Sequence, residues 1–126
     1  MIETIAPPRP RLGRADVNAA LDSIVGEVGW LTTAQLAGLI KADGIVGWRD
    51  SARWHPVGLW VVGALQARGV DAAGYSWVES LKVHDKRRVV VGEARISEGH
   101  TLYGLECEIN DGGWGVLIRQ GEGDER

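Results

Sequence analysis

The spacing of apolar residues changes once along this chain, from a helical period to a strand-like one, at about Ala73. Before that residue, apolar side chains recur every three or four positions in three segments, of which the first covers residues 17–28. After it, apolar and polar residues alternate, as they do in half-buried strands. The change predicts an α+β fold in which three N-terminal helices are followed by a four-stranded antiparallel β-meander that packs its apolar face on the helices.

Residue types at the expected helix ends support the three helical segments. Asp16 precedes the first helix as an N-cap, and Thr32 and Gln35 have the spacing of a capping box before the second. Pro56 suits the first position of the third helix, because the N–H that proline lacks would have no partner there. Gly69 is expected to close that helix in the left-handed conformation.

Four strands are predicted in the second half of the chain, over residues 75–84, 87–96, 101–109 and 114–120. The links between them are short, and short links join antiparallel neighbours. In the third predicted strand, Glu106 and Glu108 would face water while the residues between and beside them face the core.

The chain of 126 residues is long enough for one domain. We expect an extended arm rich in proline and arginine over residues 1–14, a single α+β domain over 15–121 and an acidic tail over 122–126. The net charge is −3, but residues 1–95 carry 12 Lys and Arg against 10 Asp and Glu. The cations therefore concentrate outside the C-terminal part, so the acidic total does not exclude a nucleic-acid partner.

Neither composition nor motifs indicate an enzyme, a cofactor or a metal site. The single cysteine, Cys107, lies between two glutamates, whose negative charge opposes the reactive thiolate. The three histidines lack the spacing of metal ligands. One cysteine fits a reducing compartment, and the longest near-apolar run, residues 57–65, is far shorter than the ~20 residues that span a bilayer. We therefore expect a cytoplasmic protein that does not enter a membrane.

Two segments resemble parts of winged helix-turn-helix DNA-binding domains. Residues 30–37 (WLTTAQLA) resemble the opening of the first helix of a helix-turn-helix unit. Residues 57–70 (VGLWVVGALQARGV) resemble a recognition helix that ends in a glycine followed by an apolar residue. The resemblance covers about residues 16–96, where three helices would precede a β-hairpin wing. It implies a small DNA-binding protein, such as a regulator or an accessory factor of a phage or mobile element.

The resemblance also implies that three basic elements meet one DNA duplex. The arm would lie in a minor groove through Arg9 and Arg11. The segment before the third helix would approach the major groove through Arg49, Arg53 and His55. The hairpin turn would lie on phosphates as a wing, through the cations Lys82, Lys86, Arg87 and Arg88.

A protein-binding module is the alternative hypothesis. The chain has six tryptophans and no phenylalanine, and exposed tryptophan is a common anchor at protein interfaces. An inhibitor, immunity or host-takeover factor of this kind would present Trp48, Trp54 and Trp114 beside the acidic side chains of Glu106 and Glu108. A homodimer is compatible with either hypothesis. The two hypotheses differ in one respect, since DNA binding requires the cations to gather on one face.

Overall fold

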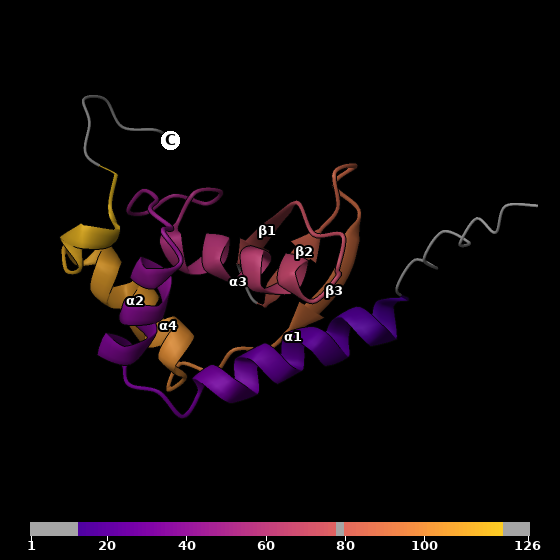
Figure 1. Cartoon of the computed structure of the whole chain (residues 1–126), viewed down its shortest axis with the longest axis horizontal. Coiled ribbons are helices and arrows are strands. Elements are labelled where there is room, and N and C mark those ends of the chain that lie inside the picture. The colour runs from indigo at the N-terminus through magenta and orange to yellow at the C-terminus, as the bar shows by residue number, and fades with distance from the viewer. Residues whose placement is uncertain (1–12, 78–79, 120–126) are drawn as a thin grey trace, which may run out of the picture.

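The computed structural model describes residues 13–77 and 80–119, which form four α-helices and one three-stranded sheet (Figure 1). The helices are α1 (Arg14–Val28), α2 (Thr33–Ala42), α3 (Pro56–Ala67) and α4 (Thr101–Asn110). The strands are β1 (Gly74–Trp77), β2 (Leu81–His84) and β3 (Val90–Ala94), and a short 3₁₀ helix, η1, covers Gly115–Leu117. The α+β class is confirmed, whereas the expected numbers of helices and strands are not.

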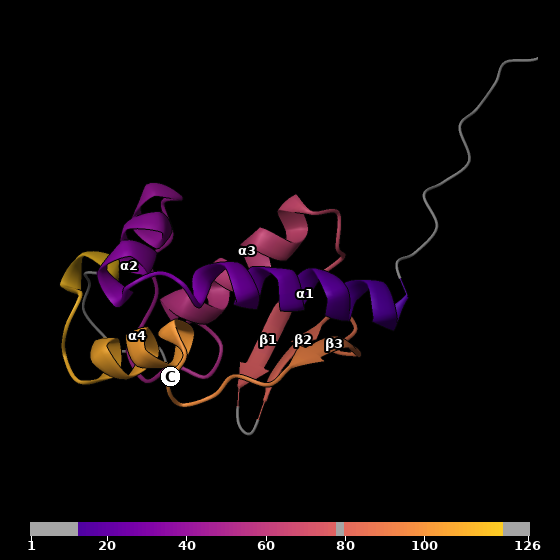
Figure 2. The same cartoon turned by 90° about the horizontal axis from the view of Figure 1, so that it is seen from below.

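The sheet is antiparallel throughout, in the order β1-β2-β3. Tyr75 pairs with Val83 between β1 and β2, and Leu81 pairs with Ala94 between β2 and β3. The sheet lies at one end of the molecule, and α2 and α4 lie at the other (Figures 1 and 2). The long helix α1 runs beside both ends, and α3 lies between them, against β1.

The core draws side chains from every helix and from the sheet. Leu21, Leu36, Leu65, Leu81 and Leu105 are completely buried, and they come from five different elements. The central helix α3 contributes most, because seven of its twelve residues are buried. Within the described residues, no helix is both long enough and apolar enough to cross a bilayer.

The expected ends of the second and third helices are confirmed. The Thr32 hydroxyl accepts a hydrogen bond from the backbone N–H of Gln35 at 3.0 Å, and the Gln35 side chain accepts one from the N–H of Thr32 at 2.9 Å. Pro56 is the first residue of α3. Gly69 has φ +85°, and the N–H of Val70 bonds back to the carbonyl of Leu65 at 3.0 Å. Because these signals are local, the start of α2 and both ends of α3 can be predicted from the sequence.

The start of the first helix differs from the prediction. Gly13, not Asp16, is the N-cap of α1, so Arg14 belongs to the helix and not to an extended arm. Asp16 lies in the first turn instead, where a carboxylate is favoured by the helix dipole. The remaining residues of the predicted arm, 1–12, and the predicted acidic tail lie outside the described residues.

The predicted strand over residues 101–109 is wrong, because this segment forms α4. Its sequence fits both periods, and the structure buries Leu102, Leu105 and Ile109, which are three and four residues apart. His100 begins the helix: its Nδ1 accepts a hydrogen bond from the N–H of Leu102 at 3.0 Å. Packing of one helical face and this cap together decide the conformation.

Two further strand predictions need correction. The strand expected over residues 75–84 is in fact two antiparallel strands, β1 and β2. The strand expected over 114–120 is replaced by η1, followed by a single bridge between Ile118 and Gly47. Trp114 takes a left-handed conformation, with φ +57°, which interrupts an extended chain. The strand expected over 87–96 is shorter and corresponds to β3.

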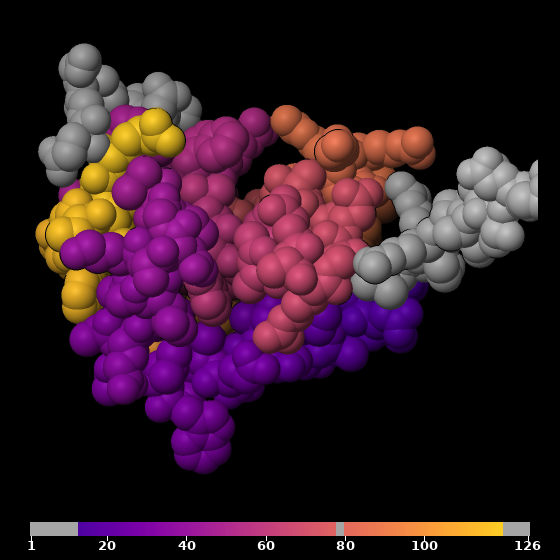
Figure 3. Space-filling view, in the orientation of Figure 1, coloured from indigo at the N-terminus to yellow at the C-terminus, as the bar shows by residue number. Residues whose placement is uncertain are grey.

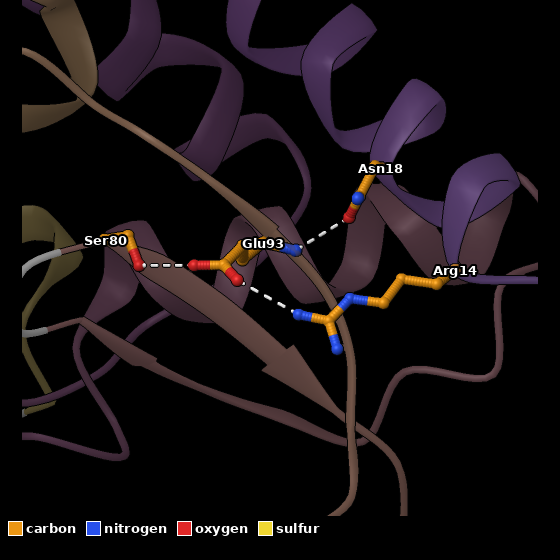
Figure 4. A network of polar contacts seen from close by, with 4 residues as sticks. All are labelled: Arg14, Asn18, Ser80 and Glu93. Atoms are coloured by element: carbon orange, nitrogen blue, oxygen red, sulfur yellow. Dashed lines mark hydrogen bonds and ion pairs between the residues drawn. The ribbon is translucent and has the colours of Figure 1, made fainter.

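The two edges of the sheet differ in what covers them. Asn18 of α1 accepts a hydrogen bond from the backbone N–H of Glu93 in β3 at 2.9 Å (Figure 4). The Glu93 carboxylate also pairs with Arg14 at 3.0 Å and accepts a bond from the Ser80 hydroxyl at 3.0 Å. This network fastens α1 along the β3 edge. In the described part of the chain no strand pairs with the outer edge of β1.

Candidate functional site

A groove of about 540 Å³ opens between the loop before α3, the outer side of α3 and the first strand of the sheet. We call it the main groove. Leu59, Val62 and Tyr75 give it apolar walls, and Arg53, His84 and Arg88 line it with cationic or polar groups. Figure 3 shows the hollow between the magenta loop and the orange β2–β3 turn. None of the described residues that line it is Asp or Glu.

A smaller hollow of about 310 Å³ adjoins the main groove. Trp54 and Leu59 line both spaces, so the Trp54 indole stands at their junction. Trp48 and Arg119 also line this side hollow. Trp54 is 51% exposed, so part of this residue is accessible beside the two hollows.

The loop over residues 48–55 is closed by its own hydrogen bonds. The N–H of Trp48 donates to the carbonyl of Trp54 at 2.8 Å, and the Ser51 hydroxyl accepts a bond from the N–H of Trp54 at 2.9 Å. Gly47 precedes the loop, where a Cβ would collide with the Trp54 carbonyl oxygen. The loop therefore presents Arg53 and Trp54 from a fixed backbone.

The β2–β3 turn holds Arg88 in a strained conformation. The Asp85 carboxylate accepts hydrogen bonds from the N–H groups of Arg87 and Val89, at 2.8 and 3.0 Å. The N–H of Arg88 donates to the carbonyl of Asp85 at 3.0 Å, and Arg88 has φ +65°. Glycine is the usual residue at this left-handed position of a three-residue hairpin loop. Strain of this kind often marks a position that serves function.

His84 lies across a glycine in the neighbouring strand. A Cβ on Gly74 would collide with the His84 ring, so the imidazole occupies the space that a side chain at this position would fill. Nδ1 of His84 donates to the carbonyl of Asp85 at 3.1 Å. Nε2 has no hydrogen-bond partner among the residues that the structure describes.

The arginines divide into two groups. Three are bound within the fold: Arg14 to Glu93, Arg68 to Glu27, and Arg49 to the carbonyls at the end of α4. The other five described arginines, Arg53, Arg87, Arg88, Arg95 and Arg119, form no side-chain ion pair or hydrogen bond within residues 13–77 and 80–119. Two of them, Arg53 and Arg88, line the main groove.

Arg49 and His55 have structural roles in this arrangement. The Arg49 guanidinium donates to the carbonyls of Ile109, Gly112 and Gly113 at 2.9–3.1 Å. His55 is 2% exposed, and its Nδ1 accepts a bond from the N–H of Val57 at 3.2 Å as the N-cap of α3. Burial lowers the pKa of His55 to about 4. Neither side chain lines the main groove.

The other cations expected to contact DNA occupy several positions. Lys82 is half-buried and precedes His84 by two residues in β2, so the two side chains share the outer face of the sheet. Lys86 and Arg87 are exposed at the β2–β3 turn, beside Arg88. Arg9 and Arg11 lie outside the described residues. Arg53 and Arg88 therefore line the main groove, and Lys86 and Arg87 lie in the turn beside Arg88. Arg49 and His55 do not line the groove.

The residues expected to bind a protein are divided between two regions. Trp48 and Trp54 line the hollows described above, whereas Trp114 lines neither of them. The Trp114 indole N–H donates to Glu108 at 2.8 Å, and the other carboxylate oxygen of Glu108 accepts a bond from Thr33 at 3.1 Å. Trp114 and Glu108 thus join α4 to its surroundings.

The expected acidic face of Glu106 and Glu108 does not form. Residues two apart in a helix point to nearly opposite sides, whereas in a strand they share a face. Because residues 101–110 form α4, the two carboxylates diverge. Glu106 is half-buried, and burial raises the pKa of its carboxyl group.

Sequence reasoning missed most residues that line the two hollows, among them Leu59, Tyr75, His84 and Arg119. Only His84 had a usable signal, because its two-residue spacing from Lys82 in a strand places both on one face. The others meet the groove through packing between elements that are distant in sequence.

Within the described ranges, no three His, Cys, Asp or Glu side chains are grouped so that they could hold a metal ion. No family model, curated protein or solved structure matches this chain.

Proposed function

We propose that this protein binds DNA through the main groove and the adjacent β2–β3 turn. One observation carries the proposal: in a chain with net charge −3, the described residues that line this groove include two arginines and no Asp or Glu. An acidic protein that gathers unpaired cations at one concave site is suited to a polyanion. The exposed side chains of Lys86 and Arg87 extend the positive charge along the turn.

The chemistry of arginine favours phosphate as the bound group. A guanidinium offers planar pairs of N–H donors that match two phosphate oxygens, and it keeps its charge at every physiological pH. Each phosphate that is neutralised releases condensed counterions, so affinity falls as the salt concentration rises. The contacts of Arg53 and Arg88 would position the backbone of the nucleic acid and would carry little sequence information.

In this proposal, the part of the protein that contacts DNA differs from the part that the winged-helix resemblance implies. In winged-helix domains a recognition helix enters the major groove. Here Pro56, Val57 and Gly58, at the start of α3, are buried, and its N-cap His55 is buried as well. We therefore assign the contact to the groove beside α3 and to the turn, which takes the part of a wing.

The test measures the fluorescence anisotropy of labelled DNA, both duplex and single-stranded, at low salt. We expect salt-dependent binding by the wild-type protein. The double variant R53E/R88E should bind at least tenfold more weakly, because two attractive phosphate contacts become repulsive. The control K41E/R95E makes the same change in net charge at two exposed residues that line neither hollow.

We expect the control variant to lose much less affinity than R53E/R88E. An absence of binding by the wild-type protein to either form of DNA would overturn the proposal. Equal losses in the two double variants would show that total charge matters and that the groove does not.

A protein partner is the second candidate function, and the exposure of Trp54 favours it. Half-exposed tryptophan beside a hollow is typical of an anchor at a protein interface. A partner captured from lysate after nuclease treatment, and lost with Trp54→Ala, would support this candidate. Loss of all captured protein on nuclease treatment would favour DNA.

A further inference from the structure

We infer that the main groove receives an unpaired base of single-stranded DNA, with the base against Trp54 and its flanking phosphates at Arg53 and Arg88. This inference rests on the proposed function and goes beyond it. DNA binding by itself requires only cations on a surface. The groove also has apolar walls and a half-exposed tryptophan, which binding to phosphate alone does not explain.

The apolar walls are the first reason. Leu59, Val62 and Tyr75 lie behind the two arginines in the main groove. A duplex presents phosphates, sugars and base edges, while the faces of its bases remain stacked inside the helix. Such a ligand would satisfy the arginines and leave the apolar walls unused. An unpaired base exposes two flat apolar faces, and it therefore fits both parts of the groove.

Trp54 is the second reason. Its indole is half exposed and stands between the main groove and the side hollow. Aromatic rings in such positions are the platforms on which proteins stack bases from single strands, whatever the base sequence. The volume of about 540 Å³ lies within the range of small-ligand sites, roughly 300–1,000 Å³, and suits one nucleotide.

The side hollow offers a position for the next nucleotide. It adjoins the main groove at Trp54, and it repeats the same chemistry with a second indole, Trp48, and a further arginine, Arg119. Among the residues that the structure describes, none that lines it is acidic. Two adjoining hollows, each with an aromatic ring and an arginine, match the repeating base and phosphate of a strand.

The outer edge of β1 supplies polar groups at the same place. Gly74 and Ser76 line the main groove, and they belong to the strand that has no second partner in the described residues. An edge strand carries backbone N–H and C=O groups that no neighbouring strand pairs. These groups can bond to base edges without demanding one base, since every base carries both donors and acceptors.

Hydrogen bonds within the loop and the turn hold the backbone at the groove before a ligand binds. The loop that carries Arg53 and Trp54 is closed by hydrogen bonds, and Arg88 is held at φ +65° by the Asp85 turn. A backbone that is already held loses less freedom on binding, so more of the contact energy appears as affinity.

The experiment compares a labelled oligothymidylate with a duplex of equal length at the same low salt, by fluorescence anisotropy. We expect the single strand to bind wild-type protein at least tenfold more tightly. Trp54→Ala should weaken single-strand binding by roughly tenfold or more and duplex binding much less, since stacking is lost and the cations remain. Trp54→Phe, which keeps an aromatic face, should recover part of the loss.

Trp30→Ala is the matched control, because Trp30 is 91% exposed and lines neither hollow. It should leave both affinities unchanged. Far-UV circular dichroism of each variant verifies the fold, which removal of a half-exposed ring should preserve. Polyglutamate of equal charge should compete poorly with the oligothymidylate.

Equal or tighter binding of duplex would overturn this inference and leave the proposed function standing. Unchanged single-strand affinity in Trp54→Ala, or an equal loss in Trp30→Ala, would also overturn it. Effective competition by polyglutamate would show that the groove recognises only negative charge, as an acidic protein segment would supply. Failure of both nucleic acids to bind would remove the inference and the proposed function together.

Discussion

The His55 imidazole and the Asn110 side-chain amide form a 3.0 Å hydrogen bond that joins the N-cap of α3 to the last residue of α4. Nδ1 of the ring accepts a bond from Val57, so Nε2 carries the proton and donates it to Asn110. The same amide oxygen accepts a bond from the N–H of Asp50 at 3.0 Å. One neutral histidine thus connects two helices and the loop that carries Trp54.

Acid should destabilise the protein through His55. Burial lowers the pKa of His55 from 6.5 to about 4, so the unfolded state binds a proton that the folded state excludes. Above pH 6.5 both states are neutral, and the group adds no pH dependence. As pH falls from 6.5 to 4, the unfolded state is favoured, and the free energy of unfolding should decrease by up to about 3 kcal/mol. Urea titrations across this range measure the slope.

His55→Asn provides the comparison, because asparagine caps a helix but does not titrate. The variant loses the bond to Asn110, so we expect it to be about 1–2 kcal/mol less stable than wild type at pH 7. The difference between the two proteins should shrink as pH falls and should reverse before pH 4, because the loss of about 3 kcal/mol in wild type exceeds the deficit of the variant. A constant difference at every pH would contradict the neutral, buried state of His55.

Arg49 should matter for stability more than for binding. Its guanidinium bonds to three carbonyls at the end of α4, where a cation also meets the negative end of the helix dipole. Arg49→Ala should lower the free energy of unfolding by roughly 2–3 kcal/mol, and Arg49→Lys should recover little, because lysine lacks the planar fork. Urea midpoints measure both effects.

The DNA affinity of folded Arg49→Ala should remain within a few-fold of wild type. A stable variant with strongly reduced DNA binding would instead show that Arg49 contacts the nucleic acid directly, as the sequence pattern indicated.

Two glycines in α3 should respond oppositely to alanine. A Cβ on Gly58 would overlap the Tyr75 ring, whereas a Cβ on Gly63 would lie 3.9 Å from the Ile45 side chain, at ordinary contact distance. Gly58→Ala should therefore destabilise by about 2–3 kcal/mol through overpacking. Gly63→Ala should stabilise by roughly 0.5–1 kcal/mol through helix propensity. Thermal and urea unfolding of both variants test the close contact between α3 and β1.

Arg88→Gly should separate stability from function. Glycine adopts positive φ without the cost that a side chain incurs, so the variant should gain about 0.5–1 kcal/mol in the free energy of unfolding. Its DNA affinity should fall at the same time, because a groove cation is lost. Arg87→Gly, at the exposed position before Arg88, is the control. It should not be stabilised, because Arg87 does not have a positive φ. A destabilised Arg88→Gly would contradict the strain assigned to this residue.

The site was only partly predictable from the sequence. Arg53, Arg88 and Trp54 were recognisable, because arginine and tryptophan in loops and turns point to binding. Their convergence on one groove was a hypothesis that needed coordinates. Arg49 carries the same type of side chain as Arg53, and no local pattern distinguishes the one that caps a helix from the one that faces a groove.

The sequence by itself determined the three N-terminal helices and three of their boundaries, because caps such as Thr32 with Gln35 act within a few residues of the chain. Only the tertiary structure decided whether residues 101–110 form a strand or a helix, because their apolar positions fit both equally well. Packing of Leu102, Leu105 and Ile109 into the core selected the helix. The groove likewise depends on the tertiary structure, because its walls come from segments that only long-range packing brings together.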